Sequence, residues 1–361
     1  MRVKVSKISL DGKLNFRAGD QVAVRGRNKI LPTFNTNNCS ETLQAIVARM
    51  SRVRVFRKSV GRAFLFMNEW VWDRLPLSLK TTRAMHSYGT FIHSLVKLRA
   101  ERRQYHGTYF FRNRPELELI RAISNQRAQG STLSISVLAC SNGAEVYSIL
   151  WTIRSARPDL KVIVHAIDIS NDILEIAKKG AYSLKAQELM DSPIFERLTE
   201  DEMEALFDRE KDQVKIKSWI KEGINWQVGD AGNAELARAL GGQDIVVANR
   251  FLCHMAPPDA EACLRGIARL VNPGGYLFVS GIDLNIRTKV ALDLGWTPVT
   301  DLLEEIHNGD SSVRRDWPSK YWGLEPFTRK RRDWNVRYAS VFQLCSKMQS
   351  RTSLITGEIT R

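Results

Sequence analysis

A turn of small residues after a predicted buried strand is the first candidate for a binding site. The run LSISVLA (133–139) leads into the turn ACSNG (139–143) and then directly into a helical pattern. Small residues let a ligand approach the backbone, and the N-terminus of the following helix favours an anion. A dinucleotide-binding turn would need the pattern GxGxxG, whereas this turn holds one glycine. The turn therefore favours a ligand without a pyrophosphate.

Two aspartates end the next two predicted strands. Asp168 lies 25 residues after Gly143, where an acidic side chain would meet the ribose hydroxyls of a nucleoside. The alternative for Asp168 is a helix N-cap, although Ser170 is the better placed cap. Asp230 would accept a hydrogen bond from an adenine amino group, with a turn-forming aspartate as the alternative. Nucleoside recognition without a phosphate loop points to S-adenosylmethionine (SAM) as the ligand.

Strand and helix patterns alternate around these residues. Besides 133–139, strands are expected at 161–168, 225–230, 244–252, 276–282 and 337–344, and helices at 144–156, 171–180 and 260–271. Such repeats predict an α/β fold with a parallel, doubly wound sheet and right-handed crossovers. Charged and alternating sequence at about 184–222 predicts a small, partly stranded insertion. Ligands of such sheets bind at the carboxyl ends of the strands, where the candidate residues fall.

The charge distribution separates the first third of the chain from the rest. Residues 1–130 hold 25 Lys and Arg against 8 Asp and Glu, whereas the remainder holds 29 against 31. We predict a basic, mainly helical N-terminal region at 1–105 that is broken near Pro76, a catalytic domain at 106–348 and a flexible tail at 349–361. The basic region suits an acidic protein surface, a nucleic acid or a membrane face; the alternative is a solvated face without a partner.

The composition excludes several classes of protein. An apolar fraction of 43% with nine tryptophans can form a sizeable core, which excludes a wholly disordered chain. No run of about 18 apolar residues occurs and the N-terminus lacks the apolar segment of a secretory signal, so we expect a cytoplasmic protein without membrane insertion. Five cysteines without a CxxC pair predict buried thiols, neither a disulfide framework nor a metal site.

Five further segments carry a family pattern. They are HGTYFFRNRPELELI (106–120), ACSNGAEVYSI (139–149), AIDISNDILEIAKKGAYS (166–183), VANRFLCHM (247–255) and LVNPGGYLFVSGID (270–283). Their order and spacing resemble the CheR-type chemotaxis-receptor glutamate methyltransferases over about 108–285, roughly half of the chain. The resemblance implies a class I, Rossmann-like methyltransferase domain, SAM as cofactor, and methyl transfer to a glutamate carboxylate of a receptor protein.

The resemblance also implies roles for individual residues. Thr108 and Arg112 fall in the family's TxFFR element, at positions that resemble cofactor-contacting and active-site residues. Arg112 could hold the cofactor's carboxylate or orient an acceptor carboxylate, with an ordinary surface charge as the alternative. Glu145 is placed to bind the cofactor's amino group, Asp168 the ribose and Asp230 the adenine. The whole expected cofactor-binding set is Thr108, Arg112, Ala139, Ser141, Gly143, Glu145, Asp168, Ile169, Asp230, Ala231, Arg250 and Phe251, and the expected catalytic residues are Arg112 and His254.

The chain departs from the family pattern near the expected acceptor. In the first box, four residues differ from the family: Ala139, Asn142, Ala144 and Val146. After the fourth strand the family's CRNVLIYF reads ANRFLCHM, so Arg250 stands at an Asn position and His254 at the active-site Tyr. A histidine could be the general base for an amine or hydroxyl acceptor, which a carboxylate acceptor would not need. The alternative for His254 is a hydrogen-bonded residue at the pocket rim.

Three functions therefore remain open. The first is a protein carboxyl methyltransferase that acts on receptor-like helices, favoured by the five ordered segments. The second is a related methyltransferase with a small-molecule or other non-receptor acceptor, favoured by Arg250, His254 and an N-terminal region without a family match. The third is a cofactor-binding regulatory module without turnover, favoured by the altered first box. A nucleic-acid substrate is not expected, because the chain lacks both a [DN]PP[YFW] motif and a Pro-Cys nucleophile pair.

Overall fold

The computed structural model describes residues 61, 63–80, 82–99, 106–185, 194–309, 317–319 and 325–344. The described residues from Phe64 onward belong to one compact unit, residues 64–361, whereas residues 61 and 63 belong to a unit that spans 1–63. Most of the expected N-terminal region and the whole expected tail at 349–361 lie outside the described residues.

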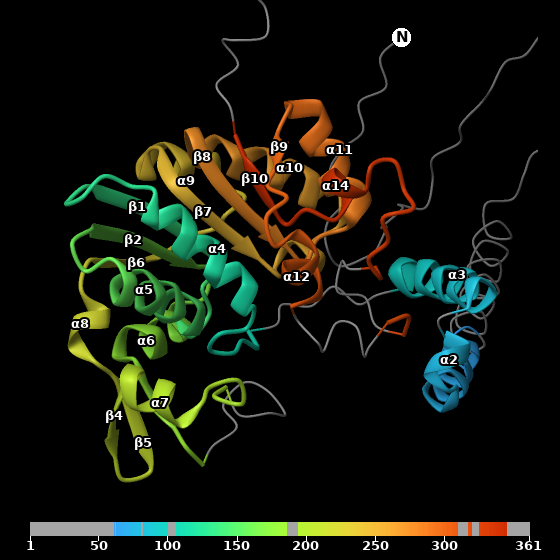
Figure 1. Ribbon diagram of the computed structural model, residues 1–361, viewed down its shortest axis with the longest axis horizontal. Helices are drawn as coiled ribbons and strands as arrows, with labels where there is room; N and C mark the ends of the chain where they lie inside the picture. Colours follow the sequence, from blue (N-terminus) through green and yellow to red (C-terminus); the bar gives the residue numbers. More distant parts are fainter. Residues whose placement is uncertain are drawn as a thin grey trace, which may run out of the picture. The chain divides into compact units, whose positions relative to one another are not determined.

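A seven-stranded sheet in the order β6-β2-β1-β7-β8-β10-β9 forms the centre of the domain (Figure 1). The strands are β1 (Thr132–Leu138), β2 (Lys161–Asp168), β6 (Ile224–Val228), β7 (Gln243–Asn249), β8 (Val271–Ser280), β9 (Thr297–Pro298) and β10 (Val341–Gln343). The first five are parallel, and β10 runs antiparallel between β8 and β9. The predicted α/β, doubly wound fold is confirmed. The parallel direction is wrong for the last strand, because a strand pattern in a sequence does not encode direction.

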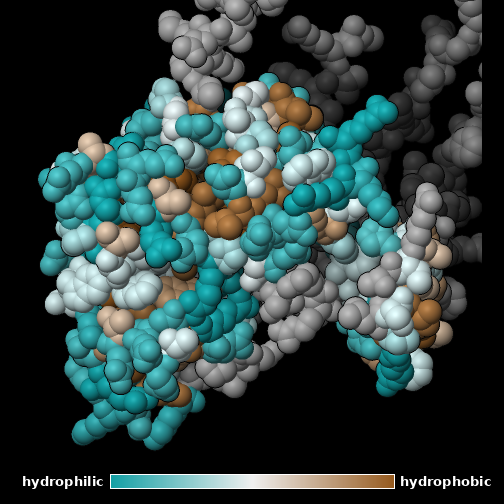
Figure 2. Space-filling view, in the orientation of Figure 1, coloured by the Kyte–Doolittle hydropathy of each residue, from teal (hydrophilic) through white to brown (hydrophobic). Residues whose placement is uncertain are grey.

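Helices cover both faces of this sheet. The helices are α4 (Arg114–Asn125), α5 (Ala144–Ala156), α6 (Asn171–Lys179), α9 (Ala234–Leu240), α10 (Pro257–Ile267), α11 (Leu284–Leu294), α12 (Leu303–Asn308) and α14 (Trp334–Arg337), with the short 3-10 helices η1 (Leu252–His254) and η2 (Ala268–Leu270). Ile245 and Val247 of β7 pack into one core with α4 and α5, whereas Val246 and Ala248 pack into a second core with α10 and α11. Figure 2 shows a mainly hydrophilic surface with an apolar area in the middle of the domain.

The first two strands and their helices follow local sequence signals. Ile135 and Val137 on one face of β1 and Ser136 and Leu138 on the other are all fully buried, as expected for a parallel strand that is covered on both faces. Helix α6 begins at its N-cap Ser170, whose hydroxyl accepts from the backbone N–H of Ile173. The capping hydroxyl of Ser170, two residues after the end of β2, thus fixes the start of α6.

A smaller sheet lies in the region of the expected insertion. It has the order β3-β5-β4 and consists of β3 (Ala181–Ser183), β4 (Phe207–Glu210) and β5 (Gln213–Ile216), with α7 (Glu200–Leu206) and α8 (Ser218–Lys221) beside them in the sequence. Phe110 packs edge-on against Tyr182 and Phe207, at centroid distances of 5.4 and 5.1 Å, and stacks on Phe195. This aromatic cluster anchors the segment that carries Thr108 and Arg112.

Helices precede the sheet domain along the chain. Residues 63–74 are helical, the helix ends before Pro76, and α2 (Leu77–Lys80) and α3 (Arg83–Arg99) follow. Proline breaks the helix because it lacks an N–H group and restricts the residue before it. None of the helices in the described part of the chain combines the length and the apolar character that crossing a membrane requires.

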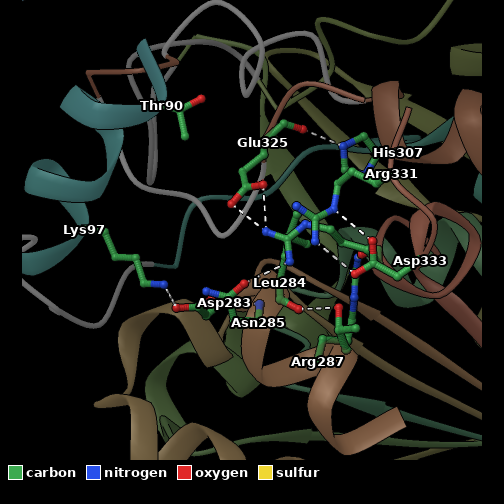
Figure 3. Close-up of polar contacts among 12 residues, drawn as sticks. Thr90, Lys97, Asp283, Leu284, Asn285, Arg287, His307, Glu325, Arg331 and Asp333 are labelled. Carbon is green, nitrogen blue, oxygen red and sulfur yellow. Dashed lines mark hydrogen bonds and ion pairs between the residues drawn. The ribbon is translucent and has the colours of Figure 1, made fainter. Parts of the chain in front are cut away.

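A buried polar network fixes the C-terminal segment to the sheet (Figure 3). Arg287 of α11 is fully buried, and its guanidinium donates to the carbonyl oxygens of Val279 and Arg337 at 2.8 and 3.0 Å. Arg337 in turn binds both carboxylate oxygens of Glu325, at 2.9 and 2.8 Å. These bonds hold α14 on α11, and thereby position β10 in the gap between β8 and β9.

Candidate functional site

A cavity of about 350 Å³ lies at the carboxyl ends of β1, β2 and β7. The turns that follow these strands and β6 form part of its wall. Residues of the segment 106–117, the first two turns of α5 and Ser280 at the end of β8 also line it. The strand order reverses between β1 and β7, so the cavity lies at the switch point where ligands of such sheets bind. Its volume is within the usual range of about 300 to 1,000 Å³ for small-molecule sites.

The turn after β1 presents its backbone to this cavity. Ala139 and Ser141 line the cavity and have left-handed φ angles of 54° and 51°. A non-glycine residue in this region costs about 1 to 3 kcal/mol and persists only where other contacts hold it. The Ser141 hydroxyl donates to the carbonyl oxygen of His106 at 2.6 Å, and its N–H donates to Asp168 at 2.8 Å. The turn is therefore tied to the segment before α4 and to the end of β2.

Asp168 is held in one orientation by backbone donors. Its side chain is nearly buried, at 3% exposure, and its two carboxylate oxygens accept from the N–H groups of Ser141 and Ser170, at 2.8 and 3.0 Å. Ser170 caps α6, so Asp168 does not serve as the cap. Each carboxylate oxygen keeps a second acceptor position. The carboxylate is thus oriented in advance for ligand hydroxyl groups.

Asp230 lies in the cavity wall and also forms a turn. Its carboxylate lines the cavity and also accepts from the N–H of Gly232 at 2.8 Å, which makes it a turn former. Ile169, Ala231 and Phe251 line the cavity nearby, and the side chain of Ile169 is 57% exposed. An exposed isoleucine beside acidic acceptors is a suitable surface for a flat apolar base with polar edges.

Gly143 is the one expected site residue that does not line the cavity. It is the N-cap of α5 with a φ of 88°, and a Cβ there would lie 3.1 Å from side-chain atoms of Ala177, Tyr147 and Trp226. Its glycine is therefore explained by helix packing and by the left-handed backbone.

Two carboxylates that meet on one amide form a feature that the sequence analysis missed. The Nδ2 atom of Asn249 donates to Glu116 at 2.7 Å and to Glu145 at 2.9 Å. Its Oδ1 atom accepts from the N–H and the hydroxyl of Ser280, at 3.1 and 2.8 Å. Because the N–H of Ser280 can only donate, it fixes which end of the amide faces the carboxylates. Glu116, Glu145 and Asn249 all line the cavity.

Burial changes the protonation of this pair. Burial and the nearby charge of Glu145 raise the pKa of Glu116 to about 8, although Asn249, Arg250 and Arg112 oppose this shift. Burial likewise raises the pKa of Glu145. Both shifts favour the neutral acids, because two adjacent buried carboxylates do not both ionise easily.

The local spacing around Glu116 indicates a structural role. Asn113 caps α4 and Glu116 stands three residues later, which is the spacing of a capping box. In the structure Asn113 accepts from the backbone N–H of Glu116, while the Glu116 carboxylate bonds to Asn249. The spacing is typical of a helix start, and it gives no sign that the Glu116 side chain reaches Asn249.

Two guanidinium groups and an imidazole complete the wall. Arg112 donates to the carbonyl oxygen of Gly107 at 3.2 Å, and Arg250 has a left-handed φ of 59° beside Gly281. A Cβ on Gly281 would lie 2.5 Å from the Cα of Arg250, so only glycine permits this approach. Arg112, Arg250 and His254 line the cavity, as does Thr108, which is 8% exposed.

The described cysteines are buried free thiols. Cys140 lines the cavity, but burial and the nearby Asp168 raise the pKa of its thiol well above the ordinary value. Such a thiol is a poor nucleophile, and the burial of the described cysteines agrees with the buried thiols that the sequence predicts. Within the described ranges, no group of three or more His, Cys, Asp or Glu residues is placed to hold a metal ion.

Comparisons with known proteins identify the domain that carries this site. Residues 106–285 match the family model of the CheR methyltransferase, SAM binding domain. A chemotaxis protein methyltransferase of Vibrio anguillarum is 26% identical over 169 residues, which are 45% of this chain and 58% of the relative. Chemotaxis protein methyltransferase 1 of Vibrio cholerae is 28% identical over 151 residues, 40% of this chain and 52% of the relative.

The chain thus spans little more than half the length of the curated relatives it matches. Among solved structures, a SAM-bound amino pentose methyltransferase from Micromonospora echinaspora is 14% identical, with a TM-score of 0.27, over 46% of this chain and 48% of that chain. A likeness this low bears on neither substrate nor mechanism. The family match covers the segment that builds the cavity, and residues 106–285 therefore belong to the CheR methyltransferase family as its SAM-binding domain.

Proposed function

We propose that the protein is a CheR-type methyltransferase that uses SAM to methylate a glutamate carboxylate of a protein. The observation that carries this proposal is the cavity at the β1/β7 switch point, which combines the oriented carboxylate of Asp168 with two guanidinium groups, Arg112 and Arg250. This set of charges suits a nucleoside that carries an amino-acid group together with an acidic acceptor.

The cavity wall matches the parts of SAM. In this proposal Asp168 accepts from the ribose hydroxyls, Asp230 accepts from the adenine amino group, and Ile169 and Phe251 contact the adenine. Thr108, Ala139, Ser141 and Ala231 complete the wall of the cofactor site. Glu145 binds the cofactor's ammonium group, and a guanidinium binds its carboxylate.

When bound, SAM supplies a methyl group on a sulfonium sulfur, which is an excellent leaving group. The chain's residues then have to orient the acceptor in line with that methyl group and exclude water. An ionised carboxylate is already nucleophilic and needs no general base. One guanidinium of the wall matches the cofactor's carboxylate, and the second matches an acceptor carboxylate.

The relatives support a protein as the acceptor, since both are chemotaxis protein methyltransferases. A second candidate is favoured by His254, whose ring lies at the cavity wall where it could accept a proton from an amine or hydroxyl acceptor. In that case the acceptor is a small molecule or another non-receptor substrate.

Calorimetric titration with SAM and S-adenosylhomocysteine tests the cofactor first. We expect binding of both, and binding of neither would overturn the proposal. Radiolabelled methyl transfer to helical peptides that contain glutamate, with glutamine peptides as the matched control, then tests the acceptor. A carboxyl methyl ester releases labelled methanol in mild alkali, whereas a methylated amine or an ether does not. Alkali-stable product would favour the second candidate, and binding without transfer would favour a regulatory module.

A further inference from the structure

The Glu116–Asn249–Glu145 arrangement has the chemistry of a cation site. We propose that Glu116 and Glu145 together bind one primary alkylammonium group, with Asn249 holding the two carboxylates apart in a fixed geometry. The proposal rests on the assignment of this cavity as the SAM site, since the amino-acid end of SAM carries such a group. The new element is Glu116, a second carboxylate where one would already balance a single positive charge.

Two helix starts bring the carboxylates together. Glu116 lies in the first turn of α4, and Glu145 lies in the first turn of α5. Helix N-termini favour negative side chains, so both helices direct an acid toward the cavity. The Oε1 atom of each carboxylate accepts a hydrogen bond from the Nδ2 of Asn249. No other hydrogen bond to either carboxylate occurs among the described residues, which leaves the Oε2 atoms for a ligand with several donors.

The two carboxylates of Glu116 and Glu145 favour the binding of a cation. Asn249 donates two hydrogen bonds but carries no charge, so it cannot neutralise two carboxylates. The Arg112 and Arg250 guanidiniums lower the pKa of both acids, yet burial still raises it. An ammonium group supplies one full charge and three donors, and would allow both acids to ionise.

The wall also favours an amino-acid zwitterion over a simple amine. Glu116 and Glu145 present negative charge, while Arg112 and Arg250 present positive charge to the same cavity. An ammonium and a carboxylate on one carbon would satisfy both sets of groups. The same ammonium chemistry could also come from an amine acceptor, and the experiment separates these two sources.

Calorimetry on the full chain compares two ligands. S-adenosylhomocysteine carries the amino-acid end, whereas 5′-methylthioadenosine has the same nucleoside without the ammonium. We expect Glu116→Gln to weaken the affinity for S-adenosylhomocysteine roughly tenfold or more, and to change the affinity for methylthioadenosine by no more than about twofold. Glu118→Gln, an exposed change on the same helix, is the matched control and should alter neither affinity.

Proton release gives a second readout that a purely structural role would not change. Because Glu116 has a pKa of about 8, it is mostly protonated at pH 7 and must lose its proton to bind a cation. We expect S-adenosylhomocysteine to release up to about one proton at pH 7, measured in buffers with different ionisation enthalpies. Glu116→Gln should abolish this release. The affinity of the wild-type protein for S-adenosylhomocysteine should rise from pH 6 to 8. The charged groups that face Glu116 are Glu145, Arg112 and Arg250.

The outcomes separate the two sources of the ammonium and the two proposals. If Glu116→Gln loses affinity for S-adenosylhomocysteine alone, the cofactor is the source of the ammonium group. If the affinity for S-adenosylhomocysteine is unchanged in Glu116→Gln, a second test uses n-propylammonium. An amine acceptor is identified if n-propylammonium stabilises the wild-type protein but not Glu116→Gln, and if tetramethylammonium stabilises neither. Equal loss of both nucleosides, or no effect of any of these ligands, overturns the ammonium site. Wild-type protein that binds neither nucleoside overturns the proposed function instead, and the n-propylammonium titration then decides the ammonium site alone.

Discussion

The acidic side chains of the cavity are oriented in three different ways. Asp168 accepts from two backbone N–H groups, Asp230 accepts from one within its own turn, and Glu116 and Glu145 share a side-chain amide. Backbone donors are fixed by the strands and turns, so the carboxylate of Asp168 needs no rearrangement to meet a ligand. This residue is therefore the sharpest single test of the nucleoside site.

We expect Asp168→Ala to weaken S-adenosylhomocysteine binding by about 1 to 3 kcal/mol, because the change removes the acceptor for two hydroxyl groups in a buried site. Calorimetric titration measures this loss. Asp172→Ala, an exposed change in the first turn of α6, is the matched control and should leave the affinity unchanged. An unaltered affinity in Asp168→Ala would remove the ribose assignment.

Strand ends and helix starts position the remaining groups. The end of β7 carries Asn249 and Arg250, and the end of β8 supplies Ser280 and Gly281, which contact them. Ser280 fixes the amide of Asn249, while Gly281 leaves room for the backbone of Arg250. Two neighbouring parallel strands thus set the positions of one neutral and one cationic side chain in the wall.

Gly281→Ala tests this arrangement. The new Cβ would lie 2.5 Å from the Cα of Arg250, at a φ of 60°, so we expect a stability loss of about 1 to 3 kcal/mol and weaker S-adenosylhomocysteine binding. Gly274→Ala is the control, because Gly274 has a φ of 80° and no atom within 4 Å of the new Cβ. Denaturant unfolding and calorimetry measure both variants. Equal losses of stability in Gly281→Ala and Gly274→Ala, with unchanged S-adenosylhomocysteine binding, would contradict a role for the close approach of Gly281 to Arg250.

The C-terminal segment joins elements that are far apart in the sequence. Arg337 links α14 to Asn285 of α11 and to Glu325, and His307 of α12 contacts the carbonyl oxygen of Glu325 at 2.7 Å. Figure 3 shows Asn285, His307 and Glu325 in one view, with Lys97 of α3 paired to Asp283 at the start of α11. The edge of the sheet therefore depends on a buried polar network as well as on strand pairing.

The stability of the whole domain should depend on the protonation of His307. Burial lowers the pKa of His307 to about 4, below the unfolded value of about 6.5, so the unfolded chain binds more protons between these values. The stabilisation that comes from neutral His307 is fully present above pH 6.5 and is lost as the pH drops toward 4. At pH 5 the free energy of unfolding should be lower by about 2 kcal/mol.

Thermal unfolding at pH 5 and 8 measures this effect. His307→Gln should reduce the difference in Tm between the two pH values, whereas His86→Gln, a partly exposed histidine of α3, should retain it. An identical pH dependence in the wild-type protein and in His307→Gln would show that another group is responsible.

Local patterns in the sequence determined much of the fold and part of the site. The strand at 161–168 and the helix at 144–156 have the predicted bounds, because apolar runs, caps and turn residues act over a few neighbours. Asp168 ends β2 and Asp230 follows the end of β6, and both line the same cavity, since parallel strands bring their carboxyl ends to one edge.

Only the tertiary structure decided the direction of β10, the existence of the two-residue strand β9, and the pairing of Glu116 with Asn249. A strand of two residues has no period to detect, and its partner at 342–343 lies more than 40 residues away. Glu116 and Asn249 are 133 positions apart and meet through the packing of α4 on α5 beside β7. Long-range contacts between single polar side chains leave no local pattern, so the charge balance of the cavity emerges only when the chain is folded.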